Sequence, residues 1–293
     1  MNGRDNYKQK AKIILSFDDA RQDQYTAARE LLDPLKIPAV FNITSGFVDG
    51  QRVFSDIQAD PMTWDQIRWL NDSNLFEIAV HGHHHKNDLQ DFLRCRKRIF
   101  EELNVPDREV IGIASPNSQL TDDFIDKNYQ MYQQRGFSYI RTGPRYHSSK
   151  KKRKYTSVME RKCRTAARRI SRIMENPELY SIACSKNLQT IEDIYPEGRV
   201  FGKYHSVPVM GHTTWGQLEK LVKYTIRKRG ICTLMFHSIV KTNEEKAPWS
   251  WKWDDFLKLV MYLEEQRSQD SMELVTPKII RVELDEKQGH QCN

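Results

Sequence analysis

Long hydrophobic runs are missing from this chain. No stretch approaches the roughly 20 apolar residues that cross a membrane, although 39% of the 293 residues are hydrophobic, which is enough for a sizeable core. Residues 1–12 are polar and lack the apolar stretch of a secretory signal peptide. We therefore expect a soluble, cytoplasmic protein with no membrane span.

Cysteine is scarce and has no metal-binding spacing. The five cysteines are an odd number, and no two of them form a CxxC pair. Disulfide frameworks use even numbers of cysteines, and zinc knuckles use CxxC pairs. This pattern favours free thiols in a reducing compartment. The cysteines are Cys95, Cys163, Cys184, Cys232 and Cys292.

Acidic residues are almost absent from one segment. Between Arg141 and Arg172 the chain has thirteen Lys or Arg and one acid, Glu160. This segment accounts for the net charge of +7, because the rest of the chain has 33 basic and 38 acidic residues. Such a segment can dock on a nucleic acid, another acidic polymer or an anionic membrane. Because regular aromatic interleaving is lacking, we instead favour a solvated helical insertion or lid and expect no nucleic-acid partner.

Strand-like and helical patterns alternate elsewhere. Repeated βα units predict a parallel sheet, and this many predict an α/β barrel. We expect one domain over residues 1–293, interrupted by an insertion at about 142–202. The active site should lie where the strands end. The predicted strands are Ile13–Phe17, Ala39–Ile43, Phe76–Val80, Val110–Ala114, Ser138–Arg141, Ile231–Phe236 and Glu273–Val275, and the predicted helices are Gln24–Leu35, Thr63–Asn71, Asp88–Leu103, Asp122–Gln134, Trp215–Arg229 and Asp254–Gln266.

Two of these strands end in side chains that bind metals. The sequence Ser-Phe-Asp-Asp occupies residues 16–19, and His-Gly-His-His-His occupies residues 81–85. Alone, the aspartate pair is more often a turn or a helix N-cap, and the histidines could form a polar loop. Together they provide three ligands and a spare carboxylate, which suits a hydrolytic metal site with an open position for water. A third strand-like run ends in His237.

These motifs resemble those of the polysaccharide deacetylase family, carbohydrate esterase family 4. The family's T/S-F-D-D motif is matched at 16–19, its His-x-x-x-His motif at 81–85, and its leucine-containing strand ending in His at 234–237. The resemblance covers residues 11–141 and 215–282. It implies a distorted (β/α) barrel of about seven strands. It also implies removal of acetyl groups from N-acetylated or O-acetylated sugars, with a carbohydrate as the partner.

The resemblance also implies residue roles. Asp19, His81 and His85 would bind a divalent ion, with Zn²⁺ expected first and Co²⁺, Mn²⁺ or Ni²⁺ as alternatives. Asp18 would act as the general base that activates water, and His237 as the general acid that protonates the leaving group. The oligomeric state does not follow from these motifs.

The third motif of the family departs from its pattern here. The family has an arginine two residues before a proline and an aromatic residue after it. This chain has Ala114, Ser115, Pro116 and Asn117 at these positions. The family arginine orients the base, so its absence predicts altered tuning of Asp18. We still expect Ser115, Pro116 and Asn117 at the substrate, with the Asn117 N–H as an oxyanion donor.

An aromatic cluster follows the last motif. In Trp249-Ser250-Trp251-Lys252-Trp253, one ring, expected to be Trp251, could stack on a sugar. The alternative is that these rings pack at the start of the following helix. Two other functions also stay open: a metal-dependent amidase for a non-sugar amide, and a non-catalytic carbohydrate-binding barrel.

Overall fold

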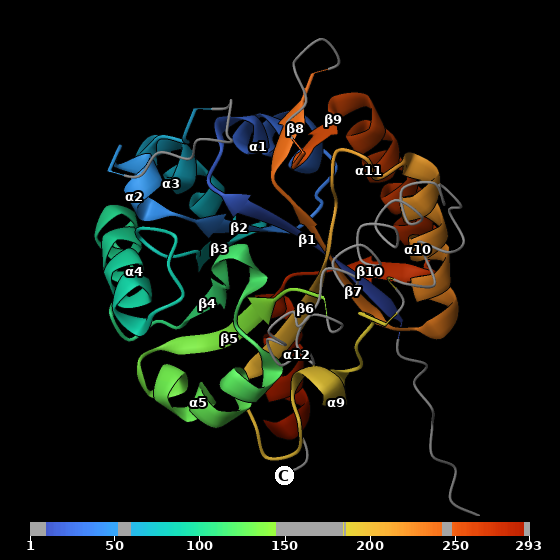
Figure 1. Cartoon of the computed structure of the whole chain (residues 1–293). Helices are drawn as coiled ribbons and strands as arrows, with labels where there is room; N and C mark the ends of the chain where they lie inside the picture. Colours follow the sequence, from blue (N-terminus) through green and yellow to red (C-terminus); the bar gives the residue numbers. More distant parts are fainter. Residues whose placement is uncertain (1–9, 52–59, 145–183, 185, 242–247, 290–293) are drawn as a thin grey trace, which may run out of the picture.

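Seven parallel strands form a closed barrel in the computed structural model, which describes residues 10–51, 60–144, 184, 186–241 and 248–289 (Figure 1). Neighbours in sequence are neighbours in the ring, and pairing of β1 with β7 closes it. A further strand, β10 (Met272–Leu274), pairs with the beginning of β1. The ring consists of β1 (Ala11–Asp19), β2 (Ala39–Ile43), β3 (Phe76–Val80), β4 (Ile111–Ala114), β5 (Phe137–Thr142), β6 (Gly202–Pro208) and β7 (Ile231–Phe236).

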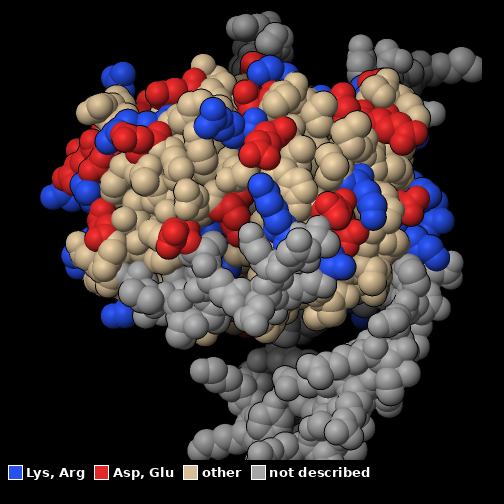
Figure 2. All heavy atoms as spheres, turned by 90° about the horizontal axis from the view of Figure 1, so that it is seen from above, with Lys and Arg blue, Asp and Glu red and all other residues tan. Residues whose placement is uncertain are grey.

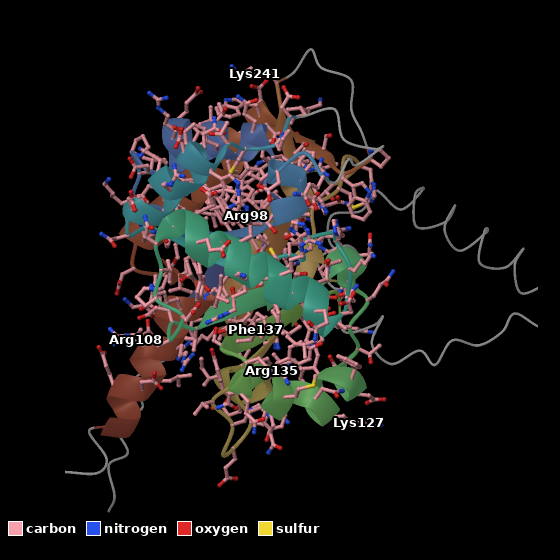
Figure 3. The ribbon with its side chains drawn as sticks, turned by 90° about the vertical axis from the view of Figure 1, so that its left-hand side faces the viewer. Arg98, Arg108, Lys127, Arg135, Phe137 and Lys241 are labelled. Carbon is pink, nitrogen blue, oxygen red and sulfur yellow. The ribbon has the colours of Figure 1, made fainter. Side chains whose placement is uncertain are left out.

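Helices surround the barrel. In the side view of Figure 3, α4 runs across the outside of the strands. A small parallel pair, β8 (Ser238–Val240) with β9 (Ser250–Lys252), follows β7. The helices are α1 (Gln22–Ala27), η1 (Ala28–Leu32), α2 (Ser45–Val48), α3 (Trp64–Asp72), α4 (Leu89–Leu103), η2 (Pro116–Ser118), α5 (Asp122–Gln134), α9 (Ile191–Ile194), α10 (Trp215–Lys228), α11 (Trp253–Ser268) and α12 (Pro277–Gly289).

Successive side chains of β1 point alternately to an outer core and to the barrel lumen. Phe17 faces outward, where its ring centroid lies 5.0 Å from that of Phe41 and 5.4 Å from that of Phe236. Ile14 faces the lumen and belongs to a second apolar cluster. Burial of one such aromatic side chain stabilises the fold by about 1.5–3 kcal/mol. Phe17 therefore anchors the strand from outside, while Asp18, next to it, faces inward.

The structure confirms the predicted barrel of about seven strands, although one member differs. We did not predict β6, which begins where the expected insertion ends. Conversely, the predicted strand at 273–275 corresponds to β10, which lies beside the ring and is not one of its seven members. The basic segment expected at 141–172 lies almost entirely outside the described residues, so its predicted helical form stays a prediction.

The described surface has no dominant sign of charge on the face shown in Figure 2, where acidic and basic side chains are interspersed. Within the described part of the chain, no helix is both long and apolar enough to cross a membrane. The cysteines described there, Cys95, Cys184 and Cys232, are buried thiols.

Candidate active site

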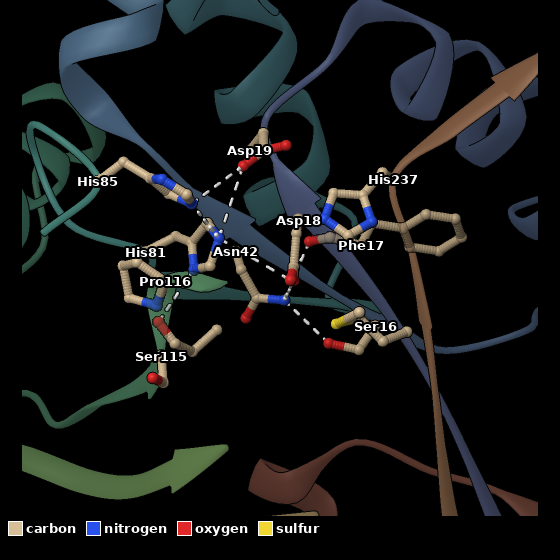
Figure 4. A network of polar contacts seen from close by, with 12 residues as sticks. Ser16, Phe17, Asp18, Asp19, Asn42, His81, His85, Ser115, Pro116 and His237 are labelled. Carbon is tan, nitrogen blue, oxygen red and sulfur yellow. Dashed lines mark hydrogen bonds and ion pairs between the residues drawn. The ribbon is translucent and has the colours of Figure 1, made fainter. Parts of the chain in front are cut away.

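Left-handed backbone at the end of β1 brings two consecutive aspartates to one site. In a regular strand, adjacent side chains point to opposite faces, so Asp18 and Asp19 would be separated by the barrel wall. Asp19 and Ala20 instead have φ values of 85° and 70°. These conformations cost an L-residue roughly 1–2 kcal/mol each. The turn that they make returns the Asp19 carboxylate to the rim above Asp18 (Figure 4).

His81 and His85 come from the loop after β3, and Asp91 of α4 shapes this loop. The buried Asp91 carboxylate accepts backbone N–H groups from His84 at 2.9 Å and Lys86 at 3.0 Å. Gly82 has a φ of 84°, and a Cβ there would lie 2.6 Å from an Asp91 oxygen. Glycine is therefore required where the loop passes over the carboxylate.

The three predicted ligands converge. Asp19 Oδ1 lies 3.5 Å from His81 Nε2 and 3.6 Å from His85 Nε2, and the two nitrogens lie 3.2 Å apart. Ligand atoms about 2.0–2.1 Å from a tetrahedral ion are roughly 3.3–3.4 Å from one another. The spacing therefore fits a single ion with nitrogen and oxygen ligands. His81 Nδ1 lies 2.9 Å from the Ala114 carbonyl, which keeps its proton on Nδ1 and leaves Nε2 as a lone pair.

Asp18 lies deeper in the lumen and is held by an arginine that we did not predict. Nη2 of Arg141, at the end of β5, donates to both Asp18 oxygens at 2.7 Å. Asn42 of β2 donates to Oδ1 at 2.8 Å. Burial alone would raise the pKa of Asp18, but the charge of Arg141, with smaller contributions from neighbouring histidines, holds it below its ordinary value. Asp18 is therefore an ionised carboxylate whose orientation is fixed by hydrogen bonds from Arg141 and Asn42.

Asp19 has an arginine of its own. The guanidinium of Arg21 donates to Oδ2 of Asp19 at 3.1 and 2.8 Å and to Ser238 at 2.7 Å. Both charged side chains are buried. Burial would raise the pKa of Asp19, but the nearby positive charges of His237 and Arg21 hold it far below its ordinary value. Asp19 is thus ready to bind a cation through Oδ1.

His237 lies across the aspartate pair from His81 and His85 (Figure 4). Burial lowers the pKa of its imidazole below the ordinary value, although the two aspartates oppose this shift. Its Nδ1 atom has no hydrogen-bond partner within the described residues. Its ring centroid lies 4.8 Å from the Trp249 ring.

Trp249, and not Trp251, is the tryptophan beside the site. Trp251 is 2% exposed, donates its indole N–H to the Thr213 carbonyl at 2.8 Å and packs against Phe236. The expectation that the Trp251 ring stacks on a substrate therefore does not hold in this structure. The alternating aromatic pattern misled us because β9 directs its middle residue into the core.

The loop after β4 is also more structural than expected. Ser115 is buried, and its hydroxyl donates to Asn87 Oδ1 at 2.8 Å. Asn87 in turn donates to the buried Pro116 carbonyl at 2.7 Å, which ties this loop to the histidine loop. The Ser115 and Pro116 side chains are thus covered, contrary to our expectation of substrate contact, while Asn117 is exposed with a φ of 51°.

His83, within the same His cluster, lies outside the converging set. It is buried, with Nδ1 2.9 Å from Ser45 Oγ and Nε2 3.1 Å from Gln51 Oε1. The side chains that gather with Asp19 are therefore those of His81 and His85, and their role as metal ligands stays a prediction.

The N-terminal part of the chain matches a known protein family. Residues 5–134, which include the aspartate pair and the histidine loop, match the family model described as polysaccharide deacetylase. The resemblance to the polysaccharide deacetylase family is confirmed. No curated protein sequence matches the chain.

Solved structures similar to this polysaccharide deacetylase-like chain differ in how much of the chain they cover. A candidate polysaccharide deacetylase from Mycobacterium smegmatis is 12% identical, with a TM-score of 0.51 over 96% of this chain and 93% of its own. This likeness shows the fold alone. IcaB from Ammonifex degensii is 23% identical, with a TM-score of 0.36 over 44% of this chain and 58% of its own. A de-N-acetylase from Aggregatibacter actinomycetemcomitans is 25% identical, with a TM-score of 0.34 over 44% of this chain and 62% of its own. The chain thus spans about three fifths of the length of these two proteins.

Proposed function

We propose that this protein is a metal-dependent deacetylase that hydrolyses the acetyl group of an N-acetylated or O-acetylated sugar or polysaccharide. The observation that carries the proposal is the convergence of Asp19, His81 and His85 beside a second, ionised carboxylate. The family match supports the same chemistry. Zn²⁺ is the first candidate for the ion because its ligands are typically histidine and carboxylate in tetrahedral geometry.

The proposed roles divide between the two aspartates. Asp19, His81 and His85 would hold the ion, which when bound polarises a carbonyl and lowers the pKa of a bound water. Asp18 would take the proton of the attacking water through Oδ2, which lies 3.8 Å from His81 Nε2 and therefore faces the metal centre. Its other oxygen, Oδ1, receives hydrogen bonds from both Asn42 and Arg141.

The leaving group would be protonated from the other side of the site. His237 is proposed as the general acid, because its imidazole lies across the aspartate pair from His81 and His85 (Figure 4). The indole of Trp249 covers one side of this imidazole and would limit its movement. The exposed Asn117 is the proposed N–H donor for the developing oxyanion.

The decisive experiment is acetate release from a panel of N-acetylated and O-acetylated saccharides. Metal-stripped protein would be assayed with and without Zn²⁺, Co²⁺ or Mn²⁺, next to Asp18→Asn and Asp19→Asn. We expect metal-dependent release that Asp18→Asn abolishes without loss of metal binding, whereas Asp19→Asn weakens binding itself. Metal-dependent hydrolysis of linear or cyclic amides alone would instead identify a non-sugar amidase. Metal binding without hydrolysis of any substrate in either panel would contradict the proposal.

A further inference from the structure

Arg141 and Ala114 are direct partners on neighbouring strands. Ala114 ends β4 and pairs in register with Arg141 of β5. Paired residues of a parallel sheet point to the same face. Their neighbours Ile113 and Ile140 both pack in the outer core, so Ala114 and Arg141 both face the lumen. The two positions are therefore one strand apart at the same height in the barrel wall.

The Arg141 side chain is fixed within the lumen by contacts at both ends of its guanidinium. Nη2 donates to the two oxygens of Asp18 at 2.7 Å, and Nη1 donates to Ser206 Oγ at 3.0 Å. Ser206 donates onward to the Thr142 carbonyl at 2.9 Å. The side chain is 3% exposed, so water does not compete for these contacts.

These contacts leave the two Asp18 oxygens in different surroundings. Oδ1 accepts from Asn42 and Arg141, whereas Oδ2 accepts from Arg141 and faces His81 Nε2 at 3.8 Å. Rotation of the carboxylate would break the two Arg141 contacts together. Well-packed apolar residues can often replace both members of such a buried pair at little cost in stability, whereas removal of one member leaves an unpaired buried charge. The contacts of Arg141 and Asn42 together fix which Asp18 oxygen faces the metal centre.

We propose that Arg141 is the positioning residue for the Asp18 carboxylate, and that it acts from β5 in place of an arginine at position 114. The inference rests on the proposed function of Asp18 as the general base. It replaces the sequence-based expectation that the base lacks an orienting arginine. The arginine is present, but it belongs to the neighbouring strand.

A relocation experiment tests the proposal. Three variants are compared with the wild type: Arg141→Met, Arg141→Lys, and the double variant Ala114→Arg/Arg141→Ala. Acetate release from N-acetylated oligosaccharides gives kcat and KM, and titration with Zn²⁺ followed by calorimetry gives the metal affinity. If the wild-type protein has no activity, the proposed function itself fails. Failure of the proposed role of Arg141 is therefore distinguishable, because it requires an active wild type.

We expect Arg141→Met to lower kcat by about 100-fold or more, because misplacement of a reacting group by about 1 Å has effects of that size. KM and the Zn²⁺ affinity should stay within a few-fold of wild type. The kcat of the double variant should be at least about tenfold higher than that of Arg141→Met, because its new arginine enters the lumen one strand away. Arg141→Lys, which keeps the charge but has no fork, should lie between wild type and Arg141→Met.

Two results would overturn the proposal. One is a wild-type kcat in Arg141→Met. The other is a parallel fall of kcat, Zn²⁺ affinity and melting temperature in all three variants, which would show that Arg141 only supports the fold. If Arg141→Met does not fold, the proposal is tested by comparing the kcat of Arg141→Lys with that of the double variant. Both of these variants retain a cation in the lumen.

Discussion

Arg21 donates two hydrogen bonds to a single oxygen of Asp19, Oδ2, and leaves Oδ1 directed at His81 and His85. The guanidinium thus shares a carboxylate with the proposed metal ion. In the absence of a cation at Oδ1, Arg21 is the close fixed positive partner of this buried aspartate. This arrangement explains how the site can keep an ionised ligand before an ion binds.

Loss of Arg21 should make the protein more dependent on metal. In Arg21→Met, the buried Asp19 charge loses its partner, and breaking such a pair costs about 3–5 kcal/mol. A bound divalent ion replaces the missing positive charge. We therefore expect a lower melting temperature in chelator and a larger increase on addition of Zn²⁺ than in the wild type. Thermal melts of both proteins in both conditions test this, with Arg68→Met, a half-exposed arginine away from the site, as the control. Equal Zn²⁺-induced shifts would contradict it.

Asp91 should control metal affinity without touching the ion. Asp91→Ala removes the acceptor for two backbone N–H groups in the histidine loop, so His85 loses its fixed position. Loss of such an outer contact typically lowers metal affinity 10- to 100-fold. Zn²⁺ titration by calorimetry measures this effect, and Asp65→Ala, on the exposed first turn of α3, is the control. An unchanged dissociation constant in Asp91→Ala would show that the loop holds its shape without the carboxylate.

Two nearby tryptophans should differ in what their replacement changes. Trp251→Ala removes a core side chain and should lower the free energy of unfolding by about 3–5 kcal/mol. Trp249→Ala, at the partly exposed ring beside His237, should have a much smaller effect on stability but should change kcat or KM. Urea denaturation and steady-state kinetics separate the two effects. Stability loss in Trp249→Ala as large as in Trp251→Ala would reverse this assignment.

Asp23 should make stability depend on pH. Burial raises the pKa of this α1 carboxyl to about 7, with Ser238 and Arg21 only partly opposing the shift. The folded protein therefore holds this proton more tightly than the unfolded chain, and each pKa unit corresponds to about 1.4 kcal/mol. The stabilisation is complete below about pH 4 and is lost as pH rises to about 7. Asp23→Asn should then be more stable than wild type at pH 8 and gain little at pH 4, as measured by thermal melts across this range. A pH-independent difference would contradict the raised pKa.

Much of the site was predictable because its chemistry is carried by adjacent residues. The aspartate pair and the His-x-x-x-His spacing are local patterns, and parallel strands bring their ends together whatever the connecting segments contain. The outward-facing Phe17 fits the same reasoning, since alternation fixes its side once Asp18 faces inward.

Arg141 was missed for a physical reason. It ends the predicted strand Ser138–Arg141, but it also begins a run of lysines and arginines that favours a solvated basic segment. Its burial depends on β5 alternation and on Ser206 of β6, a strand whose sequence, Gly-Lys-Tyr-His-Ser-Val-Pro, has no long apolar run. The burial of Arg141 can be recognised only when its partner, Asp18, is placed beside it.

The pairing of β1 with strands far along the chain has a consequence for biosynthesis. β1 contains both aspartates and is made before β7 and β10, but one of its edges pairs with β7 and part of the other with β10. Until those C-terminal segments are made, β1 lacks these neighbours, and contacts of such large sequence separation form slowly. A nascent chain would therefore expose an unsealed, largely apolar strand while the residues between β1 and β7 are being made. We expect this strand to be prone to aggregation until β7 and β10 have been made.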